Sequence, residues 1–179
     1  MTEYAELAKE CGFSASAQID PSVLAFKPEV REMCAADKCH NYNKSWACPP
    51  ACGSLEEIIQ RCKPYTGGLI VQSTVPLKNS FDYESIAALQ KSHSDSMLKM
   101  TDLLAESGAD FLPMGAGSCK RCETCTWPDN PCRFPEKVFP SMEACGLMVS
   151  DCCKSAGIPY HYGANTMTFV GAFLFKKIT

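Results

Sequence analysis

The chain has 179 residues, a net charge of −3 and 46% hydrophobic residues. A chain of this length and apolar content buries its own core, which excludes an intrinsically disordered protein. The weak negative charge gives no basis for nucleic acid or an acidic membrane as a partner. No apolar run approaches the ~20 residues that span a bilayer, and the polar start Met1–Glu10 lacks the features of a signal peptide. We therefore expect one cytoplasmic domain over residues 1–179.

The first half of the chain predicts two helices and a strand. A short polar helix over about residues 3–11 comes first. Residues 12–33 predict a loop with a weak strand or turn, because prolines interrupt them. A capping box, a serine followed three residues later by a glutamate, starts a helix from Ser54 to about Cys62. The β-branched and mostly apolar run 68–75 predicts a strand.

The second half predicts two more helices and a short strand between them. Apolar residues at spacings of three and four predict a long helix from about Asp82 to Ser107. His93 lies on its apolar stripe, so we interpret His93 as a core residue rather than a ligand. The run 111–114 predicts a strand, and a helix follows from Ser141 to about Ala156.

The end of the chain predicts a closing hairpin, with strands at 158–162 and 166–175 joined across Gly163-Ala-Asn165. The succession of strand, helix, strand, helix and hairpin predicts an α+β or α/β fold, in which helices cover a small mixed β-sheet. Two cysteine-rich loops interrupt this pattern.

Thirteen cysteines are the most informative feature of the composition. In reducing cytoplasm such a density indicates metal binding or catalysis rather than disulfides. We assign five to the core as small buried hydrophobes, four because they lie on apolar stripes of predicted helices and one because it adjoins another: Cys11, Cys62, Cys145, Cys152 and Cys153. The other eight fall in two loop segments, and eight thiolates are what two four-cysteine clusters require.

The second segment carries the sharper pattern. Cys119, Cys122 and Cys125 are spaced C-x2-C-x2-C, and Cys132 follows after six residues. One zinc ion takes two thiolates from such a C-x2-C and two from elsewhere, whereas a [4Fe–4S] cluster offers several irons that one loop can reach. Cys132 ligates this cluster or another one, and zinc stays the alternative. Four cations nearby either offset the charge of a cluster or are ordinary solvated loop charges: Lys120, Arg121, Arg133 and Lys137.

The first segment places Cys34, Cys39, Cys48 and Cys52 as a second group of metal ligands. Prolines after Cys48 rigidify a thiolate site, and Trp46 is placed to shield it from water. Cys52 immediately precedes a predicted helix, so it either ligates or packs. If it packs, the site has three protein thiolates and an open iron, and an open position is where a metal binds a substrate.

Together the two segments resemble a family of small prokaryotic proteins described as predicted metal-binding proteins (domain of unknown function 2284). The residues that carry the resemblance are Cys34, Cys39, Tyr42, Trp46-x-Cys48-Pro-Pro50, Gly115-x-Gly117-x-Cys119-x-x-Cys122-x-x-Cys125, Pro131-Cys132-Arg133-x-Pro135 and Ser141-Met-Glu143. The likeness runs from about residue 30 to the end of the chain. It implies metal binding, an iron–sulfur cluster and frequent occurrence in anaerobes, and its pattern does not include Cys52.

Three functions follow from these patterns. In the first, one or two [4Fe–4S] clusters transfer electrons to a partner redox enzyme in an anaerobe. In the second, the protein is a small redox enzyme whose open iron binds a small substrate. In the third, it is a structural zinc-binding protein, because zinc has no redox chemistry. The sequence assigns no catalytic residue and no oligomeric state.

Overall fold

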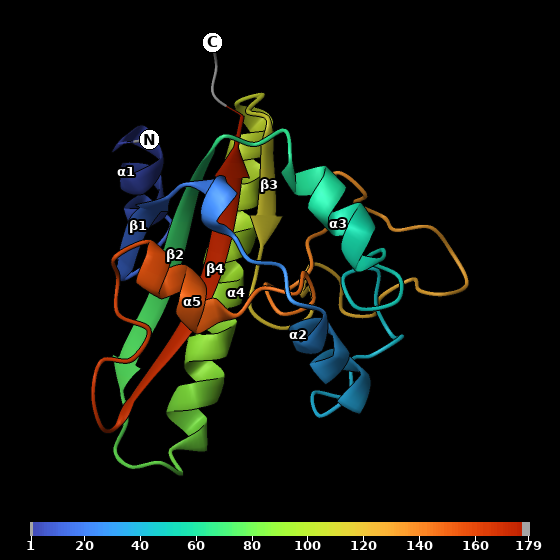
Figure 1. Ribbon diagram of the computed structural model, residues 1–179. Helices are drawn as coiled ribbons and strands as arrows, with labels where there is room; N and C mark the ends of the chain where they lie inside the picture. Colours follow the sequence, from blue (N-terminus) through green and yellow to red (C-terminus); the bar gives the residue numbers. More distant parts are fainter. Residues whose placement is uncertain (1, 177–179) are drawn as a thin grey trace.

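The computed structural model describes residues 2–176. In this part of the chain a four-stranded sheet carries helices on both faces (Figure 1). The strands are β1 (Ala15–Ile19), β2 (Gly67–Pro76), β3 (Phe111–Met114) and β4 (Thr166–Phe175). The helices are α1 (Thr2–Glu10), α2 (Pro28–Met33), α3 (Leu55–Cys62), α4 (Tyr83–Glu106) and α5 (Val149–Ser155), with 3-10 turns η1 (Pro21–Val23) and η2 (Cys34–Ala36).

The sheet has the strand order β1-β2-β4-β3, and every neighbouring pair is antiparallel. The long central pair, β2 and β4, extends from Gly67 opposite Phe175 to Pro76 opposite Thr166. This confirms the α+β class. The sheet is antiparallel rather than mixed as predicted. The strands before and after α4, β2 and β3, run in the same direction, but they do not pair, because β4 lies between them and runs in the opposite direction.

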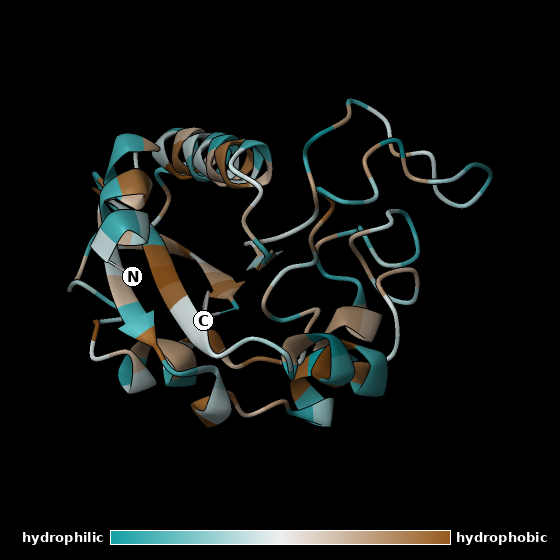
Figure 2. Ribbon diagram, turned by 90° about the horizontal axis from the view of Figure 1, so that it is seen from above, coloured by the Kyte–Doolittle hydropathy of each residue, from teal (hydrophilic) through white to brown (hydrophobic). Residues whose placement is uncertain are grey.

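Two hydrophobic clusters hold helices against the two faces of the sheet (Figures 1 and 2). Because side chains alternate along a strand, Leu69, Val71 and Phe173 face α1 and α4. Ile70 and Leu174 face the opposite way, toward α3, α5 and the turns at 142–147. All five are fully buried. The sheet is therefore the centre of a three-layer core.

The helices with clear local signals lie where the sequence predicts them. At α3 the capping box is present in full, with Glu57 N–H donating to Ser54 Oγ at 3.1 Å and Ser54 N–H donating to the Glu57 carboxylate at 2.6 Å. Asp82 caps the start of α4. Gly108, with a φ of 74°, follows its end, as expected of a glycine that terminates a helix.

The predicted helix over 141–156 is wrong in its first half, because α5 begins only at Val149. Residues 142–146 form turns whose backbone groups bond elsewhere: Met142 N–H donates to Gly115 O at 2.9 Å, and Gly146 O accepts from Lys27 N–H at 2.7 Å. Gly146 has a φ of 79°, which leaves the helical region. One bond of helical spacing remains, from Cys145 N–H to Ser141 O at 3.0 Å, but the chain leaves the helical path at Gly146. Met142 and Cys145 are nevertheless buried, as the helical stripe predicts.

The predicted hairpin at the end of the chain is also wrong. Residues 158–162 form no strand, because β2 and β3 already occupy both edges of β4. The segment is held instead by the side chain of Gln72 in β2, whose amide donates to Pro159 O at 2.8 Å and accepts from Tyr162 Oη at 2.7 Å. The strand at 166–175 is confirmed.

In residues 12–33 the predicted weak strand is β1, and α2 was not predicted. Pro28 occupies the first turn of α2, a position that proline favours, but six residues are too few to show a helical stripe. Within residues 2–176 no helix is long and apolar enough to cross a membrane.

Candidate metal centre

The first cysteine segment is a succession of tight turns between η2 and α3. Its backbone is left-handed at Asp37, His40 and Asn43, with φ between 45° and 56°, and these residue types tolerate that conformation. Tyr42 N–H donates to Asp37 Oδ1 at 2.9 Å, and Asn43 N–H donates to Pro49 O at 2.7 Å. These turns fold the segment back on itself between its second and third cysteines.

Two tryptophans join the two cysteine segments. Trp46 Nε1–H donates to Asn130 O at 3.2 Å, and Trp127 Nε1–H donates to the backbone and side-chain oxygens of Asn43 at 3.1 and 3.0 Å. The rings meet edge to face, with centroids 4.7 Å apart, an arrangement that aromatic pairs favour. Each segment therefore donates a hydrogen bond to the other, and both lie side by side next to the sheet (Figure 1).

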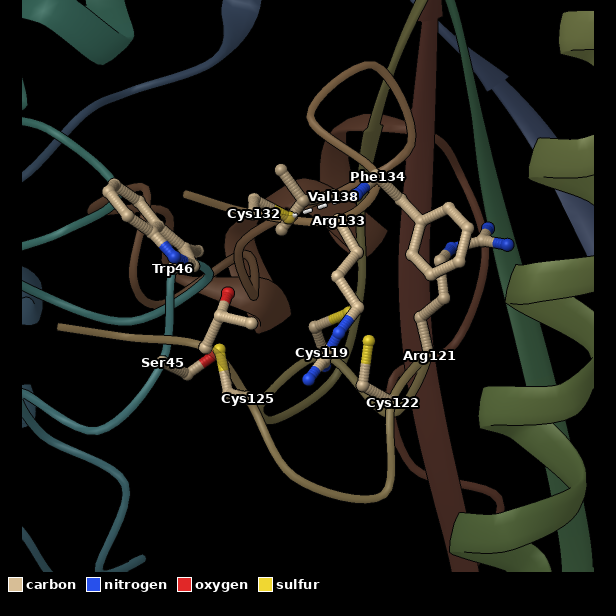
Figure 3. A pocket seen from close by; sticks show the side chains of 11 residues that line it. Ser45, Trp46, Cys119, Arg121, Cys122, Cys125, Cys132, Arg133, Phe134 and Val138 are labelled. Atoms are coloured by element: carbon tan, nitrogen blue, oxygen red, sulfur yellow. Dashed lines mark hydrogen bonds between the residues drawn. The ribbon is translucent and has the colours of Figure 1, made fainter. Parts of the chain in front are cut away.

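All four cysteines of the second segment line one pocket (Figure 3). The pocket is small, with a volume of about 30 Å³. Its other walls come from both segments and from the chain that follows Cys132: Ser45, Trp46, Arg121, Thr126, Arg133, Phe134 and Val138. The structure thus brings Cys119, Cys122, Cys125 and Cys132 to the walls of one pocket. A polynuclear cluster would require the 119–132 loop to expand around it.

Backbone amides donate to the thiols of this pocket. Phe134 N–H donates to Cys132 Sγ at 3.4 Å (Figure 3). Burial raises the pKa of the Cys119 thiol, and Cys122 and Cys132 nearby add to the rise, while the backbone N–H of Arg121 acts against it. Amide hydrogen bonds of this kind to cluster sulfurs help to set a cluster's reduction potential.

Cys125 is the thiol in this pocket whose surroundings lower its pKa and so favour the thiolate. Partial burial acts to raise its pKa, but the backbone N–H groups of Trp127 and Trp46 and the side chain of Ser45 outweigh burial and lower it. Trp46 and Ser45 belong to the first segment, so the first segment prepares a thiolate of the second. The thiolate is the form of cysteine that ligates metals.

The cations near this pocket differ in their roles. Arg133 extends across the pocket toward Cys119 (Figure 3) and donates to Thr124 O at 2.9 Å. Arg121 instead turns away, toward α4, where it and Lys137 pair with Asp102 at 3.0 and 2.9 Å. Burial acts to raise the pKa of Asp102, but the hydrogen bonds from Lys137 and Arg121, together with their charges, outweigh burial and lower it. The charge of Arg121 still acts to lower the pKa of the Cys119 thiol, so both arginines that line the pocket are placed to offset thiolate charge.

The four cysteines of the first segment gather around Cys48. Burial, together with the smaller effects of the nearby thiols of Cys39, Cys52, Cys34 and Cys119, raises the pKa of the Cys48 thiol to about 12. Cys48 and Cys52 are buried, Cys34 is half-buried and Cys39 is exposed. Because Cys119 belongs to the second segment, Cys48 is the point at which the two groups come near each other.

Cys52 differs from the rest of its group because a cation hydrogen-bonds to its thiol, whereas Arg31 affects Cys34 only through its charge. Burial raises the pKa of its thiol, but the guanidinium of Arg31 hydrogen-bonds to it and acts in the opposite direction, as does the charge of Arg61. Arg31 also donates to Ala144 O and Gly53 O, and Arg61 donates to Cys52 O at 2.5 Å. The Cys52 thiol therefore already has a partner, Arg31, when no metal is bound.

The donor set suits a metal centre that thiolates bind, since cysteines surround one pocket and a second group lies beside it. Within residues 2–176, however, no three Cys, His, Asp or Glu side chains converge tightly enough to hold a single metal ion. The sulfurs surround a hollow rather than a point.

The cysteines assigned to the core are buried as predicted: Cys11, Cys62, Cys145, Cys152 and Cys153 are at most 6% exposed. Burial by itself does not separate the two sets, because Cys48 and Cys52 are 8% and 7% exposed. Surroundings do not separate Cys52 either, because it packs in the same hydrophobic cluster as Cys145 and Cys152, whereas Cys48 belongs to neither cluster. His93 is 1% exposed and bonds to Ser73 Oγ at 2.9 Å, which confirms its place in the core.

Sequence reasoning missed several residues that shape the site. Trp127 carried a signal, because it lies two residues after Cys125 in a loop where an aromatic side chain has no stripe to join. Ser45, Arg31 and Asn43 carried none. Their partners lie in other segments, and only the fold brings them into contact.

Comparison with curated proteins finds no match, and neither does comparison with solved structures. A comparison with protein families does find one: a family described as predicted metal-binding protein (DUF2284) matches residues 17–175. The match covers both cysteine segments and the sheet except the first two residues of β1. This chain therefore belongs to the DUF2284 family of predicted metal-binding proteins.

Proposed function

We propose that this protein binds one or two [4Fe–4S] clusters and transfers electrons to a partner redox enzyme. The observation that carries the proposal is the pocket lined by Cys119, Cys122, Cys125 and Cys132. Four thiolates are the protein ligands of one such cluster, and three of these follow the C-x2-C-x2-C spacing of ferredoxin loops. When bound, the cluster supplies one-electron redox chemistry.

Two features support a cluster over zinc. First, the four thiols line one pocket from separate positions along the loop, and a cluster accepts thiolates at separate corners, whereas zinc needs four donors within about 2.3 Å of one point. Second, backbone N–H groups donate to Cys132 and Cys125. Such donors stabilise the negative charge that a thiolate-bound cluster carries.

The first segment supports a second cluster beside the first. Cys34, Cys39 and Cys52 lie close enough to Cys48 to act on its thiol, and so does Cys119 of the other group. Two redox centres so close together suit a relay of single electrons. Under this proposal Cys34, Cys39 and Cys48 ligate the second cluster, and Cys52 is its fourth ligand.

The contact between Cys52 and Arg31 favours a second candidate function. A thiol already hydrogen-bonded to a guanidinium is less available to a metal, which would leave Cys34, Cys39 and Cys48 as the protein ligands. A cluster with three thiolates has an open iron, and an open coordination position allows a metal to bind a substrate. In that case the protein is a small redox enzyme.

The test is anaerobic purification followed by analysis of iron, acid-labile sulfide and zinc, with a visible spectrum. About eight irons with equal sulfide, and a brown band that dithionite bleaches, are expected for two clusters. About four irons would restrict the proposal to the pocket of the second segment. Zinc without sulfide in a colourless protein would overturn it and leave a structural metal protein.

The two candidate functions separate in a Cys52→Ala variant. If Cys52 is a ligand, its loss lowers the iron content. If it is not, the iron content stays the same, and the enzymatic candidate with an open iron is favoured over the relay.

A further inference from the structure

An open cleft of about 340 Å³ lies against the cysteine pocket. Its lining comes from both cysteine segments and from α3: Trp46, Ala51, Cys52, Arg61, Pro131, Cys132, Pro135, Val138 and Pro140. The cleft and the pocket share three of these residues, Trp46, Cys132 and Val138. A molecule in the cleft would therefore contact a wall of the pocket that the thiols surround.

The lining of the cleft is apolar except at a few points. Three prolines, a valine, an alanine and a tryptophan form most of it. Small-molecule sites in proteins have this character: a volume of about 300 to 1,000 Å³, mainly apolar walls and a small number of polar groups that fix orientation. The volume of this cleft falls at the lower end of that range, so it suits a small ligand.

Arg61 supplies the one charged side chain of the lining. A guanidinium has five N–H donors, and the structure shows Arg61 donating one to Cys52 O. Within residues 2–176 no carboxylate forms an ion pair with Arg61. The neighbouring carboxylate of Glu57 instead accepts from Ser54 N–H in the capping box. Arg61 thus keeps donors in a fork that fits a carboxylate.

We propose that this cleft binds a small organic carboxylate, with its anionic group on Arg61 and its apolar part against Trp46 and the proline walls. A cationic ligand finds no carboxylate in the lining, and a neutral ligand offers no charge to the guanidinium. The idea that the bound carboxylate is a substrate of the adjacent centre rests on the proposed function, but the binding itself does not.

The probe is cyclohexanecarboxylate, which has one carboxylate, a compact apolar ring and no aromatic absorption. It is titrated into anaerobically purified protein, and binding is followed by calorimetry and by the fluorescence of the tryptophans, of which Trp46 lines the cleft. Cyclohexanecarboxamide has the same ring without the charge. Iron and sulfide are measured in every sample, so that the two proposals are tested separately.

Arg61→Gln removes the charge, and Ala51→Leu fills the cleft while leaving Arg61 in place. Lys63→Gln is the matched control, because it removes an exposed cation close to Arg61 in the chain that does not line the cleft. We expect the carboxamide to bind about tenfold or more weakly than the carboxylate, as the loss of a charge-assisted hydrogen bond predicts. Arg61→Gln and Ala51→Leu should weaken binding of the carboxylate by a similar factor, and Lys63→Gln should leave it unchanged.

Equal binding of acid and amide, equal affinity in Arg61→Gln, or no binding to the parent protein would overturn the carboxylate site, whatever the iron content. Loss of binding in Arg61→Gln in a protein that contains no iron would support the site and overturn the cluster proposal alone. Unchanged iron in all three variants is expected, because none of them removes a candidate ligand.

Discussion

Single residues decide which thiols of this protein are ready to bind metal. Most cysteines with a shifted pKa have it raised by burial, as for Cys48, Cys62 and Cys152. In Cys125 donated hydrogen bonds outweigh burial and lower the pKa. A buried thiol without such donors behaves as a small hydrophobe, whereas one that receives several behaves as a ligand.

Replacement of one pocket cysteine should release metal, while replacement of a core cysteine should not. Cys119→Ala removes a thiolate from the pocket, and we expect it to lose most of the iron bound by that pocket. Cys11→Ala is the control, because Cys11 packs with α1 and α4 in the hydrophobic core on the opposite face of the sheet. Iron and sulfide per chain give the result. Equal loss in both variants would mean that general unfolding releases the metal.

A further residue-scale prediction concerns His93, which packs against Phe13 and Phe169 and shares a small cavity with Lys120. Burial lowers its pKa from 6.5 to about 4. The folded state keeps His93 neutral, whereas in the unfolded chain it takes up a proton below pH 6.5. The contribution of neutral His93 to the stability of the fold is therefore complete above pH 6.5. It is lost as the pH falls from 6.5 to about 4, a change of about 3 kcal/mol.

Urea unfolding at pH 7 and pH 5 of the parent protein and of His93→Gln tests this. Between pH 7 and pH 5 the free energy of unfolding of the parent should fall by about 2 kcal/mol more than that of His93→Gln, because each pH unit below 6.5 contributes ~1.4 kcal/mol. The same pH dependence in both proteins would show that other groups cause it.

At the scale of elements, the two cysteine segments depend on each other rather than on the sheet. The first segment closes its turns with local backbone hydrogen bonds, the second has few of them, and the hydrogen bonds of Trp46 and Trp127 cross between the two. Neither segment is an independent ligand set. The first supplies donors to Cys125, and the second supplies Asn130 O to the first.

Trp127→Phe should loosen this junction and speed up metal loss. The substitution keeps an aromatic ring but removes the donor to Asn43, and one net hydrogen bond is worth about 1 kcal/mol. The measurement is the rate of iron transfer to a chelator under anaerobic conditions, with Tyr83→Phe, an exposed aromatic at the start of α4, as the control. An unchanged rate in Trp127→Phe would show that the tryptophan contact does not retain the metal.

Across the whole molecule, stability is unevenly distributed. The sheet and α4 bury two hydrophobic clusters, whereas residues 37–53 and 116–140 consist of turns and irregular chain and extend beside the sheet (Figure 2). Regions with few buried apolar contacts and few backbone hydrogen bonds open most easily. The cysteine segments are therefore the part that metal binding would stabilise.

Removal of metal should leave the sheet folded and release the cysteine loops. We expect amides of β2 and α4 to keep their protection from hydrogen exchange after chelation, and those of 119–132 to lose it. Peptide-resolved hydrogen exchange on metal-loaded and chelated protein gives the comparison. Loss of protection in β2 as well would show that the metal is needed for the whole fold.

The sequence by itself determined the elements whose signals are local. The capping box fixed the start of α3, apolar spacing and Gly108 defined α4, and the spacing of Cys119, Cys122 and Cys125 marked one loop as a ligand group. These signals act over a few residues, so no distant partner is needed to interpret them.

Only the tertiary structure decided what depends on partners far along the chain. The closing hairpin was wrong because both edges of β4 were taken, and the 141–156 helix started late because the chain leaves the helical path at Gly146, whose carbonyl bonds to Lys27. The junction at Trp46 and Trp127 joins residues 84 positions apart. Strand pairing and loop contacts of this kind are set by competition for backbone and side-chain partners across the whole chain, and no local pattern carries that information.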